Sequence, residues 1–144
     1  MPSQDTREIT AESESLEIFP ILVQLRDHLD RDSYLDLLEE MRAEGYRLFA
    51  RYVDGEPVAV AGVKIATNFY LGRHAYVYDL VTDEDERSTG HGERLLEFVH
   101  EWAAENGCKA VELESGQWRT DAHRFYTERM GYDEYCTSFV YDLS

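Results

Sequence analysis

The segment Arg87-Ser88-Thr89-Gly90-His91-Gly92 carries two glycines two residues apart, at a point where a strand pattern gives way to a helix pattern. Glycine lets the backbone turn tightly and approach a ligand closely, and the amide groups of a first helical turn attract anions. The segment matches neither GxxxxGK[ST] nor GxGxxG, two other phosphate-binding patterns. A bound diphosphate fits this pattern, and so does an ordinary turn.

Two stretches of the chain resemble the signatures of the GNAT-type N-acyltransferases. The first is Asp79-Leu80-Val81-Thr82 followed by Arg87-x-x-Gly90-x-Gly92, which resembles a strand, then [RQ]-x-x-G-x-[GA], then a helix. The second is Leu113-Glu114-Ser115-Gly116 and the run from Arg119 to Tyr132, which resembles a helix ending in an aromatic-Tyr pair and a Gly-aromatic stop. The resemblance covers the element order from about residue 6 onward and is specific from residue 76 to 132.

This resemblance implies that acetyl-CoA lies where two neighbouring parallel strands, 69–82 and 108–115, splay apart. A parted strand leaves N–H and C=O groups that need partners, and the amides of pantetheine can supply them. Backbone amides after the strand would hold the pyrophosphate, and an arginine would orient the loop or pair with phosphate. The residues implied are Leu80, Val81 and Thr82 for pantetheine, and Arg87, Ser88, Thr89, Gly90, His91, Gly92 and Glu93 for the pyrophosphate.

The resemblance also implies that Tyr126 donates a proton to the departing thiolate of CoA. The alternative is that Phe125 and Tyr126 both pack a helix against the core, which we expect of Phe125.

An attacking amine must lose a proton, so a base or a water chain to one is required. Glu112, Glu114 and Asp79 are all candidates, with Glu114 the best single one, and each can instead be a surface acid. His123 can be a base or structural. Arg119 departs from the asparagine that many relatives carry there. We expect Trp118 and the early helices to shape the acceptor pocket.

Hydrophobic periodicity predicts the elements that position these residues. The order predicts a mixed α/β (α+β) fold, with a mostly antiparallel central sheet that contains a splayed strand pair and is flanked by helices, in a single domain over 1–144. Ser13 is the expected first N-cap, Pro20 a kink or the true helix start, and Asp54-Gly55 a hairpin turn. Helices are predicted from residue 13 and over 33–44, 92–106 and 121–130, and strands over 6–11, 46–53, 57–67, 69–82, 108–115 and 135–143.

The charge balance narrows the possible partners. The chain has 30 acidic and 14 basic residues, a net charge of −16. This charge repels the phosphate backbone of nucleic acids and argues against a nucleic-acid partner. The scattered acids favour adaptation to high salt, and steering of a cationic acceptor is the alternative. No signal peptide or membrane span is evident, so we expect a cytoplasmic protein. We expect Cys108 and Cys136 to be thiols, and no bound metal.

The sequence therefore predicts an N-acetyltransferase that moves an acetyl group from acetyl-CoA to a primary amine by direct attack. The acceptor can be a small molecule or a peptide amine. The alternative from another class is a non-catalytic acyl-CoA-binding or regulatory module. The final strand, with alternating Tyr135, Thr137, Phe139 and Tyr141, could pair across a two-fold axis in a homodimer.

Overall fold

The alternating apolar residues in the first part of the chain form a sheet in the computed structural model, which describes residues 4–87 and 89–144. The strand order is β1-β2-β3-β4-β5, and the first three pairs are antiparallel. One pair is parallel, which confirms the predicted mixed fold with a mostly antiparallel sheet. The strands are β1 (Gln4–Glu8), β2 (Arg47–Val53), β3 (Glu56–Asn68), β4 (Gly72–Thr82) and β5 (Ala110–Leu113).

The chain divides into two compact units, Met1–Glu112 and Leu113–Ser144, which are described separately. The first unit contains the sheet, the short 3-10 turn η1 (Glu84–Glu86) and the four longer helical segments α1 (Glu12–Glu17), α2 (Phe19–Leu25), α3 (Arg31–Ala43) and α4 (His91–Glu105). The second contains α5 (Thr120–Arg124) and η2 (Phe125–Arg129). The single domain over 1–144 stays a prediction.

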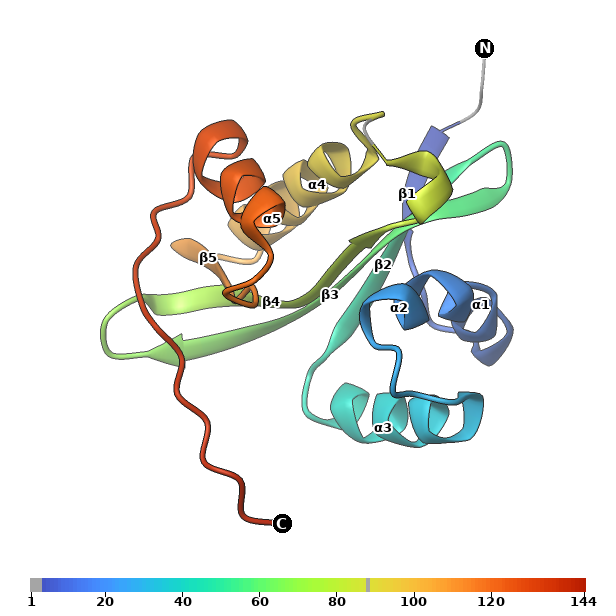
Figure 1. The fold of residues 1–144 in the computed structure, drawn as a ribbon, viewed down its shortest axis with the longest axis horizontal. Coiled ribbons are helices and arrows are strands. Elements are labelled where there is room, and N and C mark those ends of the chain that lie inside the picture. Colours follow the sequence, from blue (N-terminus) through green and yellow to red (C-terminus); the bar gives the residue numbers. More distant parts are fainter. Residues whose placement is uncertain (1–3, 88) are drawn as a thin grey trace. The chain divides into compact units, whose positions relative to one another are not determined.

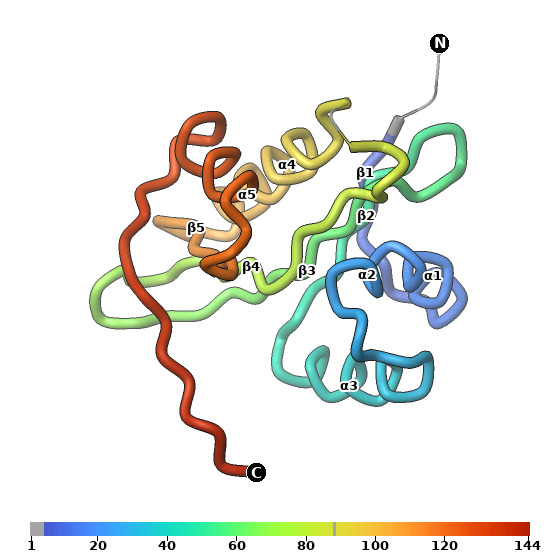
Figure 2. The backbone as a smooth tube through the Cα atoms, in the orientation of Figure 1, coloured from blue at the N-terminus to red at the C-terminus, as the bar shows by residue number. Residues whose placement is uncertain are grey.

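In the first unit, helices cover both faces of the sheet. Figure 1 shows α1, α2 and α3 against one face and α4 against the other. Figure 2 traces the chain from β1 through these three helices and back to β2, which lies beside β1 in the sheet. The long connection between β1 and β2 therefore contains all three helices of one layer.

Strand alternation decides which residues enter each layer, because successive side chains point to opposite faces. Leu48, Ala50 and Tyr52 of β2 belong to a buried cluster that also contains Ile18 and residues of α2 and α3. Phe49 points the other way, and its ring centroid lies 5.5 Å from that of Phe98 and 5.3 Å from that of Trp102 in α4. The buried face of α4 is made by Leu95, Leu96, Val99 and Ala103.

The hairpin turn between β2 and β3 forms at Asp54-Gly55, as predicted. Asp54 has φ 51° and Gly55 has φ 81°. Two successive positive φ values are the mark of a type I′ turn, whose twist matches that of the flanking strands. The Asp-Gly pair suits this turn because both residue types tolerate the left-handed region.

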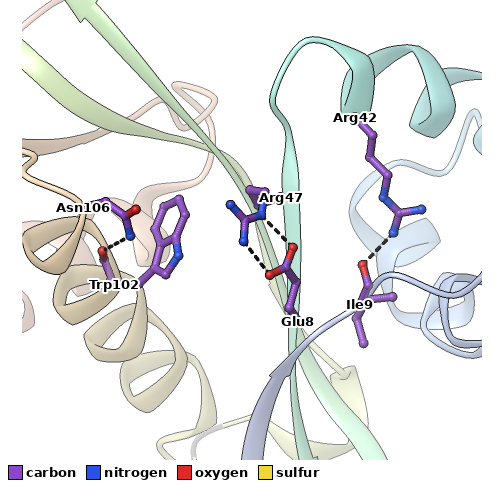
Figure 3. Close-up of polar contacts among 6 residues, drawn as sticks. All are labelled: Glu8, Ile9, Arg42, Arg47, Trp102 and Asn106. Carbon is purple, nitrogen blue, oxygen red and sulfur yellow. Dashed lines mark hydrogen bonds and ion pairs between the residues drawn. The ribbon is translucent and has the colours of Figure 1, made fainter.

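Arginines join neighbouring elements of the first unit (Figure 3). The Arg47 guanidinium donates to both carboxylate oxygens of Glu8 at 2.6 Å, which links β2 to β1. Its central carbon also lies 5.5 Å from the centroid of the Trp102 ring, within the range of a cation–π contact. Arg42 of α3 donates to the Ile9 carbonyl at 2.7 Å.

A β-bulge interrupts the pairing of β3 with β4. Gly62 lies opposite Asp79 and Val63 lies opposite Val77, so Tyr78 is the extra residue of β4. The Tyr46 side chain lies directly over Gly62, because a Cβ built there would be 1.6 Å from the phenol oxygen. Only glycine leaves room for this ring.

Several predicted boundaries shift in the structure. Pro20 lies in the first turn of α2, which confirms that it marks a helix start. Ser13 is not the first N-cap: α1 begins at Glu12 and its N-cap is Ala11. The first strand lies at Gln4–Glu8 rather than at 6–11, because its register is set by pairing with β2, which local alternation does not reveal.

The second unit departs most from the sequence prediction. The predicted helix over 121–130 forms as α5 followed by the π-helical turn η2. The predicted strand over 135–143 is wrong: residues 131–144 form neither helix nor strand in the structure. Alternating side chains make a segment compatible with a sheet, but a strand also needs a hydrogen-bonding partner, which a sequence pattern does not supply.

We predict that Gly62→Ala destabilises the protein by at least about 2 kcal/mol, because the added methyl overlaps the Tyr46 phenol. Urea unfolding measures the effect. In a Tyr46→Ala background the same substitution should cost much less, since the clashing ring is gone. An equal cost in both backgrounds would contradict this packing.

Candidate functional site

The end of β4 and the start of α4 lie together in the first unit. The Arg87 Nε donates to the Thr82 carbonyl over a long 3.5 Å. A Cβ built on Gly92 would lie 3.0 Å from the Thr82 hydroxyl, which is tighter than nearly all real contacts. Gly92 therefore lets the first turn of α4 approach the last residue of β4. Ser88, also predicted in this loop, lies outside the described residues.

Gly90 sets the direction in which α4 begins. It is the N-cap of this helix and has φ 84°, a left-handed conformation that suits glycine. Within the helix the amide of Arg94 already donates to the Gly90 carbonyl at 3.1 Å. The amides of the first turn come before this ladder and point out of the helix end, where the helix dipole favours an anion.

A buried arginine of β2 contacts the first residue of this helix. The Arg51 Nε donates to His91 Nδ1 at 3.1 Å, and both side chains are buried. A guanidinium can only donate, so Nδ1 must accept and the ring proton lies on Nε2. That nitrogen lies 3.8 Å from a carboxylate oxygen of Glu86. The geometry therefore requires a neutral His91 imidazole.

Electrostatics agree with this protonation state. Burial is the main cause that lowers the pKa of His91 below 6.5, and the positive charges of Arg51 and Arg94 lower it further. The Glu86 carboxylate acts in the opposite direction without cancelling them. Burial also lowers the pKa of Arg51, and Arg94 adds to this.

Three arginines lie around this loop, among the acids of residues 83–86 and Glu93. Arg51 and Arg94 act electrostatically on His91, and Arg87 lies in the loop itself. Three arginines at one helix start are a notable share of the 14 basic residues. A negatively charged ligand at this helix end would be favoured by both the cations and the helix dipole.

Beyond the bulge, β4 extends past the end of β5. Val81 lies opposite Val60, and Leu80 and Thr82 pair with the residues on either side, so one edge of this segment is bound to β3. On the other side, the Lys109 amide donates to the Arg73 carbonyl near the beginning of β4. A parallel strand of only four residues that starts there ends before it reaches the level of Leu80. The three residues predicted to meet pantetheine thus lie beyond β5.

A buried carboxylate stands next to this segment. Asp79 accepts from the Arg26 Nε at 2.8 Å and from the Tyr46 hydroxyl at 2.7 Å. Arg26 also donates to the Tyr78 carbonyl at 2.8 Å, which ties the end of α2 to the bulge. Burial and the charge of Asp79 raise the pKa of Tyr46 well above 10, so this phenol stays a donor. Both oxygens of Asp79 are engaged, which favours a structural role over that of a base.

Of the other predicted bases, Glu112 accepts from the Tyr70 hydroxyl at 2.9 Å and lies 3.8 Å from the His74 Nε2. Glu114, in the second unit, has an exposed side chain and follows β5 directly. His123 has its Nε2 2.9 Å from the Gly116 carbonyl, a contact that favours a structural role.

Tyr126 is the buried residue of the second unit and lies in η2. π-Helical turns occur frequently at functional sites. Burial raises the pKa of Tyr126 above 10, so its phenol carries a proton at neutral pH. The Phe125 ring packs edge-on against it, with centroids 5.4 Å apart. Trp118 is 84% exposed and lies over Gly116.

Sequence reasoning missed Arg51, Arg26 and Tyr46. A signal existed for Arg51: it interrupts the otherwise apolar and aromatic run of β2, and a charge in such a strand needs a specific partner. Nothing in the local pattern marks Arg26 or Tyr46, because their partner Asp79 lies 53 and 33 residues away.

Two other kinds of site are absent from the residues that the structure describes. Within residues 4–87 and 89–144, no three His, Cys, Asp or Glu side chains are grouped to hold a metal ion. The same residues contain no helix with the length and apolar character needed to cross a membrane. Cys108 and Cys136 are both free thiols.

Comparison with known proteins agrees with this geometry. The chain belongs to the Acetyltransferase (GNAT) family, whose sequence profile matches residues 10–132. It is 39% identical over 127 residues to an uncharacterized N-acetyltransferase, YhdJ, of Bacillus subtilis (strain 168), covering 88% of this chain and 89% of that protein. Membership of the family implies acyltransferase activity and the binding of acyl-CoA.

Solved structures share the fold. The aminoglycoside N-acetyltransferase AAC(6')-Iy in complex with CoA superposes with a TM-score of 0.86 at 18% identity, covering 99% of this chain and 95% of that one. A transcriptional regulator from Bacillus halodurans C-125 gives 0.83 at 24% identity, covering 98% and 100%. Glucosamine-6-phosphate N-acetyltransferase from Arabidopsis thaliana gives 0.76 at 18% identity, with 99% of each chain covered.

We predict that His91 makes stability depend on pH. The unfolded histidine binds a proton near pH 6.5, whereas the folded one resists it, so the free energy of unfolding falls as the pH drops below about 6.5. His91→Gln keeps an acceptor for Arg51 but does not titrate. Urea unfolding from about pH 7.5 to about pH 5 should show the native protein losing stability relative to this variant. A constant difference, or one that changes in the native protein's favour, would contradict the neutral imidazole.

Proposed function

We propose that the protein transfers an acetyl group from acetyl-CoA to a primary amine by direct attack. The observation that carries the proposal is the start of α4, where Gly90 and Gly92 bring amide groups and arginines to the end of β4. This arrangement occurs in a chain of the GNAT family, at the motif that resembles the family's pyrophosphate loop. A diphosphate gives a helix start of this kind a strong anionic ligand.

In the proposed complex, CoA lies along β4 toward the start of α4. Backbone groups of Leu80, Val81 and Thr82 pair with the pantetheine arm. The amides of Thr89, Gly90, His91, Gly92 and Glu93 hold the pyrophosphate, together with that of Ser88, and Arg87 pairs with a phosphate oxygen. The position of the segment beyond β5 supports the first contact, and the left-handed Gly90 supports the second.

The reaction needs no covalent enzyme intermediate. The lone pair of the amine attacks the thioester carbonyl, a C–N bond forms, and the C–S bond breaks with the thiolate of CoA as leaving group. Tyr126 gives the thiolate its proton, a role that its raised pKa supports because the phenol is neutral beforehand. The attacking nitrogen loses a proton, for which the exposed carboxylate of Glu114 is the proposed acceptor.

The proposed acceptor is a small-molecule amine. Two structural neighbours are named as enzymes that acetylate aminoglycosides or glucosamine-6-phosphate, which supports small acceptors in this fold. A peptide amine is a second candidate, compatible with the 30 acidic residues. A non-catalytic acyl-CoA-binding module is the remaining alternative, and catalysis separates it from both.

The test is to incubate the purified protein with acetyl-CoA and a panel of primary amines, in dilute buffer and in molar KCl, and to follow free thiol. We predict amine-dependent thiol release. Tyr126→Phe should lower kcat by about 10²-fold and change the KM for acetyl-CoA much less. Tyr141→Phe makes the same change on an exposed ring and is the matched control. Binding of acetyl-CoA without thiol release across the panel would overturn catalysis, and an unchanged kcat would remove Tyr126 from it.

A further inference from the structure

A cavity of about 140 Å³ lies in the first unit, lined by residues of α2, α3, β2 and β4 and of the loop between the two helices. Most of its lining is apolar, including Leu22, Leu37, Leu38 and Met41. An apolar cavity of about 150 Å³ is large enough to bind benzene. The size and lining therefore fit one compact apolar group, such as a phenyl or branched alkyl group.

The polar end of this cavity is already neutralised. Asp79 is the single acid among its lining residues, and both of its oxygens are held, by Arg26 and by Tyr46. The other ionisable lining side chains besides Tyr34 and Tyr46 are Arg26 and His28. An ammonium group entering the cavity would have to displace Arg26 from Asp79. Otherwise the ammonium would lie beside the Arg26 guanidinium with no carboxylate to pair with. Burying a charge without a partner is strongly unfavourable.

The cavity also borders the segment of β4 that is proposed to meet pantetheine. Asp79 directly precedes Leu80, the first of the three residues proposed to meet pantetheine, and Arg26 holds the carbonyl of Tyr78. A group bound in the cavity would thus lie beside the segment of β4 that is proposed to bind pantetheine, in the same unit of the chain.

We propose that this cavity binds an apolar group of the acceptor, so that the preferred substrate is a monoamine with a compact hydrophobic substituent rather than a polycation. The inference rests on the proposed acetyl transfer and names its substrate class. The net charge of −16 does not oppose it, because a diffuse acidic surface attracts any ammonium ion, whereas the cavity lining decides which substituent is buried.

The kinetic test compares 2-phenylethylamine with ethylamine, spermidine and kanamycin as acceptors of acetyl from acetyl-CoA. We expect kcat/KM for 2-phenylethylamine to exceed that for ethylamine and for each polycation at least tenfold, since one apolar group in a fitted pocket gives roughly 10- to 200-fold discrimination. A polycation used as well as or better than 2-phenylethylamine would overturn the proposal. Thiol release with none of the amines would instead contradict the proposed transfer.

A variant of the cavity wall links the preference to this site. Leu37 lines the cavity and is 44% exposed, so Leu37→Trp can fill the space with little harm to the fold. We expect it to lower the ratio of kcat/KM for 2-phenylethylamine to that for ethylamine at least fivefold. Asp36→Trp, on an exposed neighbouring position of α3, is the matched control. An unchanged ratio in Leu37→Trp would overturn the assignment.

Binding can be measured without turnover. The chain has three methionines, and Met41 lines the cavity. Titration of 2-phenylethylamine into the ¹³C-methyl-methionine protein should shift the Met41 methyl signal in the native protein and less in Leu37→Trp. No shift of this signal at millimolar amine would contradict the cavity as a binding site even if acetyl transfer occurs.

Discussion

The buried carboxylate of Asp79 is the constraint on which the site region of the first unit depends. It joins three elements that are distant in sequence, because Arg26 follows α2, Tyr46 precedes β2 and Asp79 itself lies in β4. Arg26 neutralises the charge and also holds the carbonyl of the bulge residue Tyr78. Tyr46 can reach Asp79 only because Gly62, which lies beneath the Tyr46 ring, has no side chain. A buried acid with two such partners costs far less than an unpaired one, and it fixes where β4 leaves its regular pairing.

The second constraint is the electrostatic design of the α4 start. A strongly acidic chain would disfavour any anionic ligand, and three arginines near Gly90 offset part of that negative charge locally. Arg51 does so from inside the sheet, through a histidine that must stay neutral to accept its hydrogen bond. The charge of Arg51 is thereby retained close to the loop, and His91 adds no competing donor at Nδ1. The bulge at Tyr78 lies just before the segment from Leu80 to Thr82, and the start of α4 follows it. Both features therefore determine the position of the segment at which CoA is proposed to bind.

Features encoded by neighbouring residues were predictable from the sequence. Asp54-Gly55 specifies its turn through the φ values that both residues tolerate, and the loop from Arg87 to Gly92 is recognisable because its glycines and helix start are contiguous. Features that depend on pairing over long separations were not. The links of Asp79 to Arg26 and of Arg51 to His91 span 53 and 40 residues, and a local pattern identifies the partner in neither case. The strand predicted over 135–143 failed for the same reason, since alternation does not identify a partner.

We propose that acyl-CoA binds along the end of β4 and the start of α4. Hydrogen–deuterium exchange of backbone amides, followed with and without CoA, tests it most directly because it reports on each segment separately. We predict that CoA alone slows exchange in Leu80–Thr82 and in Thr89–Glu93. Exchange in Arg31–Ala43, which lines the proposed acceptor cavity and not the CoA segments, should be much less affected. Protection confined to other segments, with these two unchanged at saturating CoA, would contradict this binding site.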